Sequence, residues 1–296
     1  CLKTKGPLMP IQNDRIVYLN GEFLPESEAK LSIFDRGFLF GDGIYEVTPV
    51  IDGKLIYSDL HMTRLQRSAG EIEIPLPVTT QQIVEAERRL IKDNHMTEGL
   101  IYLQLTRGAE DRNFLFSDDL APTLVMFTQA KKLLGNPQET TGLSVTSVPD
   151  QRWERRDIKS VCLLPQVMAK RIAKAQGCDE AWMIEDGFVT EGASSTAYII
   201  TADKKLVTRG NSNKTLPGCT RQAALELIDE AGLTLEERPF TLQEAMEAQE
   251  AALTSAGNFV MPVTRIDGKE VGDGRPGPLI SRLRELYLEH ARRTAI

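Results

Sequence analysis

The sequence lacks the signatures of several large classes of protein. Its 296 residues include only four cysteines and three histidines, without a C-x-x-C pair, so neither a zinc site nor a disulfide framework is expected. No apolar run is long enough to cross a bilayer. The net charge of −7 leaves no basic excess for a nucleic-acid backbone. We therefore expect a soluble, cytoplasmic protein that binds no metal, membrane or nucleic acid.

Length and patterning predict two domains. The chain exceeds the usual size of one domain, and the polar stretch 131–142, with its Gly and Pro, is the best linker candidate. Residues 10–130 are predicted to form a smaller α+β domain, and residues 143–296 a larger, mixed α/β domain. Residues 1–9 lack the layout of a secretion signal, and Met9 is a candidate natural start.

Hydrophobic periodicity predicts the elements of each domain. Asp52-Gly53 is expected to turn a hairpin because both residues tolerate positive φ. The helix at 161–176 is expected to be buried through its regularly spaced apolar side chains, which are Val161, Leu164, Met168 and Ile172. The predicted strands are 15–21, 45–58, 99–108, 121–130, 143–149, 179–185, 196–201 and 252–256, and the helices are 59–70, 79–94, 161–176, 220–231 and 279–292.

Two residues suggest chemistry at a carbonyl and a ring nitrogen. Lys159 precedes the predicted helix at 161–176, where partial desolvation would lower the pKa of its amine and free it to attack a carbonyl. Glu191 lies in FVTEGASSTAY, and a carboxylate aimed at a pyridine nitrogen would keep that nitrogen protonated. Each also has an ordinary interpretation, as a solvated lysine and as a loop with local serine hydrogen bonds.

Three further segments suggest an anion site. Thr220 follows Pro-Gly at the start of an amphipathic helix, where it could cap the helix while free N–H groups face an anion. Ser255 and Ala256 end a strand and could present backbone N–H groups. Arg64 shares a helical face with Leu60 and Ser68, so a partly buried guanidinium there would need an anion. Each segment also has an ordinary interpretation, namely a capped helix, a turn and a surface arginine.

The glycine-rich segment 34–47 argues against a nicotinamide enzyme. Its glycines at 37, 41 and 43 do not match G-x-G-x-x-G, and no helical run follows them. The segment leads directly into a strand through Tyr45, whose hydroxyl could point into a pocket or whose ring could simply belong to the core.

Taken together, these segments resemble the ordered motif set of the fold-type IV pyridoxal-phosphate enzymes. The similarity is closest to the D-amino-acid aminotransferases and runs from about residue 15 to residue 288. The segments that carry it are DRGFLFGDGIYEV, HMTRLQRS, TRGAEDRN, RRDIKSVCLLPQVMAK, FVTEGASSTAY and LPGCTRQAALELI.

The resemblance implies a binding mode for pyridoxal 5'-phosphate. Lys159 would form the Schiff base and carry the proton, and Glu191 would pair with the pyridine nitrogen. Arg64 would bind the phosphate. The backbone N–H groups that would assist it are those of Cys219 and Thr220 and those near Ser255 and Ala256.

The resemblance also implies a substrate site completed by a second subunit. Relatives are homodimers in which a loop from the partner enters each active site, and Tyr45 would line that site. In D-amino-acid enzymes the loop after TRG offers an arginine and, two residues on, a histidine to the substrate carboxylate. Here Arg112 fills the first position and Phe114 the second. The lost donor and the added ring shift the expected pocket toward apolar substrates.

The predicted activity is transamination between a D-amino acid and a 2-oxo acid. Three alternatives use the same cofactor, namely an (R)-selective amine transaminase, a branched-chain L-amino-acid aminotransferase and an aminodeoxychorismate lyase. A cofactor-free scaffold protein is the alternative from another class, and it would require Lys159 and Glu191 to be incidental.

Overall fold

The computed structural model describes residues 14–296, so the candidate start at Met9 lies outside the described residues. Residues 16–130 supply an antiparallel six-stranded sheet in the order β2-β1-β6-β5-β3-β4. Asp52 and Gly53 join β3 to β4 with positive φ angles of 53° and 72°, as predicted. The strands are β1 (Ile16–Leu19), β2 (Glu22–Pro25), β3 (Gly43–Ile51), β4 (Lys54–Leu55), β5 (Gly99–Thr106) and β6 (Thr123–Ala130).

Residues 143–270 supply a mixed nine-stranded sheet in the order β12-β11-β10-β13-β14-β7-β8-β9, with β15 beside β14. Strand β7 is parallel to both β8 and β14. The strands are β7 (Leu143–Pro149), β8 (Glu180–Glu185), β9 (Phe188–Gly192), β10 (Thr196–Ile200), β11 (Lys205–Thr208), β12 (Thr234–Glu237), β13 (Glu250–Ser255), β14 (Phe259–Ile266) and β15 (Lys269–Glu270).

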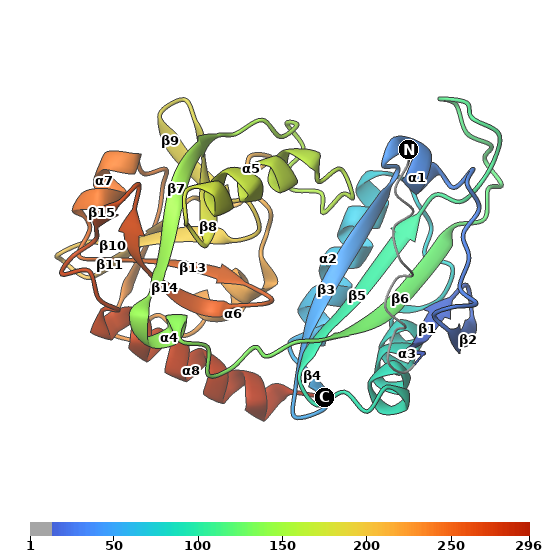
Figure 1. The fold of residues 1–296 in the computed structure, drawn as a ribbon, viewed down its shortest axis with the longest axis horizontal. Coiled ribbons are helices and arrows are strands. Elements are labelled where there is room, and N and C mark those ends of the chain that lie inside the picture. Colours follow the sequence, from blue (N-terminus) through green and yellow to red (C-terminus); the bar gives the residue numbers. More distant parts are fainter. Residues whose placement is uncertain (1–13) are drawn as a thin grey trace, which may run out of the picture.

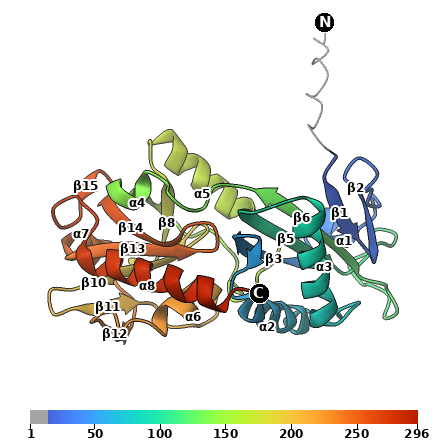
Figure 2. The same cartoon turned by 90° about the horizontal axis from the view of Figure 1, so that it is seen from below.

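Helices cover both sheets, and the segment 131–142 passes from one sheet to the other (Figure 1). Helix α8 runs along the nine-stranded sheet toward the N-terminal half (Figure 2). No helix in residues 14–296 is long and apolar enough to span a membrane. The helices are α1 (Arg36–Phe40), α2 (Ser58–Glu71), α3 (Thr80–Asp93), α4 (Gln138–Thr141), α5 (Leu164–Ala175), α6 (Cys219–Leu225), α7 (Leu242–Glu247) and α8 (Pro278–Thr294).

A shared core fixes the two halves against each other. Ile56 and Tyr57, which follow β4, belong to the same buried cluster as Tyr287 of α8 and Ile200 of β10. A second cluster packs α2 and α3 on the six-stranded sheet. Because buried apolar side chains from both halves pack together, the two halves are held at a fixed distance on either side of any cavity between them.

Helix α5 corrects the predicted burial. Leu164, Met168 and Ile172 are exposed, and the helix packs instead through Ala169 and Ala173. These alanines lie in one small cluster with residues of β7 and β8, where only short side chains allow the close approach of helix and sheet. The periodicity identified an apolar face correctly, but that face does not point into this chain's core.

Helix α6 corrects the predicted cap. Gly218 is the N-cap residue and no side chain caps the helix, so Thr220 is a buried residue of its first turn. The helix ends at Leu225, earlier than the predicted residue 231, and turns follow it. Glycine fills the cap position because the backbone there approaches Thr196 and Arg221 closely.

Candidate active site

A cavity of about 340 Å³ lies between the two halves of the molecule. Its walls come from β3 and α2 on one side and from the 152–163 segment, β9, α6 and the end of β13 on the other. The volume lies within the roughly 300–1,000 Å³ typical of small-molecule sites. Eight of the ten predicted site residues line it, and these are Tyr45, Arg64, Lys159, Glu191, Cys219, Thr220, Ser255 and Ala256.

Lys159 is held in the cavity wall by backbone pairing with β3. The N–H of Tyr45 donates to the carbonyl of Lys159 at 3.0 Å, and the N–H of Val161 donates to the carbonyl of Gly43 at 3.0 Å. The Nζ atom of Lys159 lies 4.1 Å from the centroid of the Tyr45 ring. An amine on such a fixed backbone can meet a bound carbonyl with little loss of entropy.

Arg64 enters the cavity from α2 and is oriented by Glu46 of β3. Its Nε and Nη2 atoms donate to the Glu46 carboxylate at 2.8 and 2.7 Å, and Nη1 donates to the carbonyl of Pro217 at 3.0 Å. These bonds use three of the five guanidinium N–H groups, which leaves two for an anion. Although burial opposes the charge, Arg64 holds the pKa of the Glu46 carboxyl well below its usual range.

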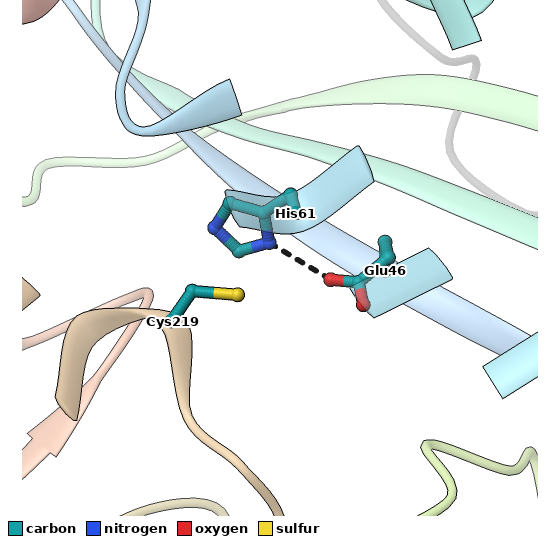
Figure 3. A group of neighbouring side chains, drawn as sticks. All are labelled: Glu46, His61 and Cys219. Atoms are coloured by element: carbon teal, nitrogen blue, oxygen red, sulfur yellow. Dashed lines mark hydrogen bonds and ion pairs between the residues drawn. The ribbon is translucent and has the colours of Figure 1, made fainter. Parts of the chain in front are cut away.

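His61 and Cys219 complete this buried cluster (Figure 3). The Nδ1 atom of His61 lies 2.8 Å from Glu46 Oε2. Burial lowers the pKa of His61, but Cys219 and Glu46 outweigh it and raise the value to about 9. One ligand atom from each of Glu46, His61 and Cys219 lies within 4.8 Å of the others, as in a metal site. Arg64 engages both oxygens of Glu46 and His61 lies within hydrogen-bond distance of one of them, so protein groups already satisfy this carboxylate.

Glu191 of β9 is fully buried at the opposite wall. It pairs with Arg152, which also binds Asp150 through Nε at 3.0 Å and Nη2 at 2.7 Å. The N–H of Leu216 donates to Glu191 at 3.2 Å. Burial raises the pKa of Glu191, and the ion pair with Arg152 works against that rise. A basic carboxylate in a low-dielectric wall is well suited to share a proton with a ligand nitrogen.

The structure does not bring Arg112 and Phe114 into this cavity. They lie in the loop between β5 and β6, which extends away from the C-terminal half in Figure 1. Phe114 is 78% exposed. The two residues contact each other and Phe40 instead, with the Arg112 guanidinium 5.3 Å from the Phe40 ring centroid and 5.6 Å from that of Phe114.

Sequence reasoning missed Glu46 and Arg152, which orient the cavity's other charged groups. A signal for Glu46 exists, because alternation in the strand 43–51 places it on the face opposite to Tyr45, and an acid there needs a buried cation. The sequence signal for Arg152 is weaker, because an aspartate and an arginine two residues apart, such as Asp150 and Arg152, are common in surface loops. Only the fold places it against Glu191.

Comparison with known proteins identifies the family. Residues 43–266 match the amino-transferase class IV family. The chain is 38% identical over 270 residues to a D-alanine aminotransferase of Staphylococcus haemolyticus, covering 91% of this chain and 95% of that protein. A D-alanine aminotransferase of Bacillus licheniformis is 38% identical over 263 residues, covering 89% and 92%. The chain belongs to the class IV aminotransferases and is an aminotransferase.

Solved structures show the same fold. The branched-chain amino acid aminotransferase of Escherichia coli superimposes with a TM-score of 0.87 at 20% identity, covering 94% of this chain and 95% of that one. The branched-chain aminotransferase of the archaeon Thermoproteus uzoniensis, solved with norvaline, gives 0.83 at 24% identity, covering 94% of each chain. The chain therefore has the α/β architecture of fold-type IV aminotransferases.

Proposed function

We propose that this enzyme transfers the amino group of a D-amino acid, of the D-alanine type, to a 2-oxo acid such as 2-oxoglutarate, with pyridoxal 5'-phosphate as cofactor. The observation that carries the proposal is the convergence of Lys159, Arg64 and Glu191 on one cavity. The D-alanine aminotransferases at 38% identity over most of the chain support the choice of substrate.

The charged groups of the cavity fit such a cofactor. Arg64, with two free N–H groups, would bind the phosphate, and the backbone N–H groups of Cys219 and Thr220 and those near Ser255 and Ala256 would assist it. Glu191 would face the ring nitrogen, and Lys159 would hold the aldehyde carbon covalently. When bound, the cofactor supplies an electron sink for the charge that develops at the substrate α-carbon.

Lys159 is also the group proposed to move protons. Its amine would take the α-proton of the substrate and carry it within the cavity until it is given up again. Tyr45, whose ring packs against the Lys159 amine, would line the path of the substrate and keep water away from that amine.

We further propose that the enzyme is a homodimer whose two domains, 10–130 and 143–296, are joined by residues 131–142. Three large apolar side chains of α5, those of Leu164, Val167 and Met168, are 69%, 53% and 49% exposed. Such an apolar face fits burial against a second copy. In a dimer, Arg112 of one subunit would bind the substrate carboxylate in the cavity of the other. A cytoplasmic location remains part of the proposal.

An (R)-selective amine transaminase is the second candidate, favoured by one observation. Phe114 and its neighbour Leu115 are 78% and 79% exposed at the tip of the loop that would meet the substrate. An apolar tip suits a substrate without a carboxylate better than it suits a charged one.

A substrate panel tests the proposal. Purified protein is assayed with D-alanine, L-leucine and (R)-1-phenylethylamine, with pyruvate or 2-oxoglutarate as acceptor, while its visible absorbance is followed before and after borohydride. We expect a borohydride-sensitive band and highest kcat/KM with D-alanine. Preference for the (R)-amine would support the second candidate, and preference for L-leucine would support the branched-chain activity. A colourless, inactive protein would contradict all three activities.

A further inference from the structure

The loop that carries Arg112 is held by contacts that the proposed chemistry does not use. Residues 110–117 lie within the connection between β5 and β6, and their side chains are largely exposed. Loops of this kind are commonly mobile. Here, however, the backbone of the loop is bonded at several points to a buried arginine and to a carboxylate within the loop itself.

Arg36 of α1 is the buried anchor, with only 4% of its side chain exposed. Its Nη1 atom donates to the carbonyl of Asn113 at 2.7 Å and Nη2 to the carbonyl of Phe114 at 3.2 Å, while Nε donates to Asp42 at 2.9 Å. The two carbonyls belong to the residues that follow Arg112. A planar guanidinium that binds successive carbonyls therefore fixes the direction of the chain beside Arg112.

Glu110 is the second residue that holds the loop, and it contacts both Arg36 and Ser117. Its Oε1 atom lies 3.3 Å from Nη1 of Arg36. Its Oε2 atom accepts from the hydroxyl of Ser117 at 2.9 Å and from the backbone N–H of Ser117 at 3.3 Å. One carboxylate thus ties the first and last residues of the 110–117 loop to each other and to the buried anchor.

Arg112 itself remains free to bind an anion. Two carboxylates near the loop are engaged elsewhere, because Arg36 and Arg107 share Asp42 and because Glu110 binds Arg36 and Ser117. Within residues 14–296 the Arg112 guanidinium makes no ion pair and lies beside the Phe40 and Phe114 rings, which attract a cation without neutralising it.

We propose that Glu110 and Arg36 form a clasp that positions Arg112 for the substrate carboxylate, so that Glu110 is a positioning residue that determines substrate affinity. This inference rests on the proposed function of Arg112. A preorganised guanidinium binds its anion without first losing the freedom of the loop and of its own side chain. The clasp would allow one arginine to hold the carboxylate without a second donor at position 114.

Glu110→Ala in the full-length enzyme loaded with cofactor tests the clasp. Asp111→Ala is the matched control, because Asp111 has the same charge in the same loop but makes no hydrogen bond or ion pair among residues 14–296. We expect Glu110→Ala to raise the KM for D-alanine roughly three- to tenfold with kcat nearly unchanged, since about one immobilised side chain is released. The KM for (R)-1-phenylethylamine and the cofactor absorbance should stay the same, and Asp111→Ala should match the parent enzyme.

Hydrogen exchange provides a readout besides activity. The N–H of Ser117 is bonded to Glu110, so its exchange should accelerate in Glu110→Ala and not in Asp111→Ala. A double-mutant cycle with Arg112→Ala completes the test, because Glu110→Ala should change the KM for D-alanine no further once Arg112 is gone.

The outcomes distinguish a failure of the clasp from a failure of the proposed role of Arg112. If Arg112→Ala raises the KM strongly but Glu110→Ala behaves like Asp111→Ala, the clasp is wrong and the proposed role of Arg112 stands. If Arg112→Ala leaves the KM for D-alanine unchanged, the carboxylate role and the clasp both fail. Equal effects of Glu110→Ala in the parent and in the Arg112→Ala background would also overturn the clasp.

Discussion

The cavity and the 110–117 loop hold their arginines in opposite ways. Arg64 and Arg152 are enclosed by protein, and each is bonded to at least one buried carboxylate. Arg112 is exposed and lies against aromatic rings. Fixed ion pairs suit a cofactor that stays bound, because they hold the binding groups in place before it arrives. An uncompensated guanidinium suits a substrate that must bind and leave.

The largest effect is expected on the cavity side, at Lys159. Replacing Lys159 by Ala should reduce turnover by roughly 10³-fold or more, because both the covalent link and the proton carrier are lost. The Lys159 amine makes no hydrogen bond or ion pair within residues 14–296, so the circular dichroism spectrum and Tm should hardly change. Steady-state turnover with D-alanine measures the effect.

Lys170 supplies the control for that substitution. It also lines the cavity, but its amine lies 2.7 Å from the buried Glu180. Borohydride should fix the cofactor to Lys170→Ala and fail to fix it to Lys159→Ala. Peptide mapping that finds the label on Lys170 would refute the assignment of Lys159.

Arg64→Ala should chiefly weaken cofactor binding. A lost charge-assisted pair to a phosphate is worth about 2–4 kcal/mol, which corresponds to roughly a 30- to 1,000-fold rise in the Kd of the cofactor. Excess cofactor should restore part of the activity. Titration of the apoenzyme with pyridoxal 5'-phosphate gives the Kd directly.

The substitution of Arg64 also removes two of the hydrogen bonds to the buried Glu46 carboxylate and leaves it with His61, which destabilises the fold. The double variant Arg64→Ala/Glu46→Gln removes that charge and separates the two effects. We expect it to recover stability while its cofactor affinity remains weak. Recovery of normal affinity in the double variant would show that Arg64 acts only through the fold.

Glu191→Gln should reduce kcat more than it reduces cofactor content. The amide keeps the shape of the side chain, and Arg152 keeps its bonds to Asp150, so the wall should remain intact. The loss of the proton-sharing carboxylate should lower kcat by roughly 10- to 100-fold. Complete loss of bound cofactor, judged from absorbance, would instead assign Glu191 a purely anchoring role.

The sequence predicts the cavity better than the loop, for a physical reason. The side chains of Arg64 and Glu191 leave regular elements, α2 and β9, whose periodicity is a local property of the sequence, and Lys159 lies in the segment between β7 and α5. Their convergence could be inferred only through family resemblance, because it depends on strands far apart in the chain. The same holds for the sheet order, in which β14 lies between β13 and β7.

The errors have a common cause as well. The sequence places the apolar face of α5 inside, yet Leu164, Met168 and Ile172 point outward, because periodicity reports that a face needs a cover but not which surface provides it. The ion pair of Arg152 with Glu191 was not predicted, because the role of a charged loop residue depends on a partner that is distant in the sequence. Both kinds of error arise where a residue's environment comes from outside its own segment.

The remaining effect is on stability and not on catalysis, and it concerns Glu87 of α3. Its carboxyl is completely buried, neither oxygen has a hydrogen-bond partner within residues 14–296, and burial raises the pKa of Glu87 to about 8. From the unfolded value near 4.5 up to about 8 the unfolded state releases this proton and the folded state keeps it, so stability falls as pH rises through this window and then levels off. Glu87→Gln should remove this dependence, leaving the variant more stable than the parent at pH 9 by a few kcal/mol, with roughly 5 as a ceiling. Urea unfolding at pH 5 and pH 9 measures this difference in stability, with the exposed Glu85→Gln as control. Parallel losses of stability in the parent and in Glu87→Gln would show that Glu87 does not titrate in this window.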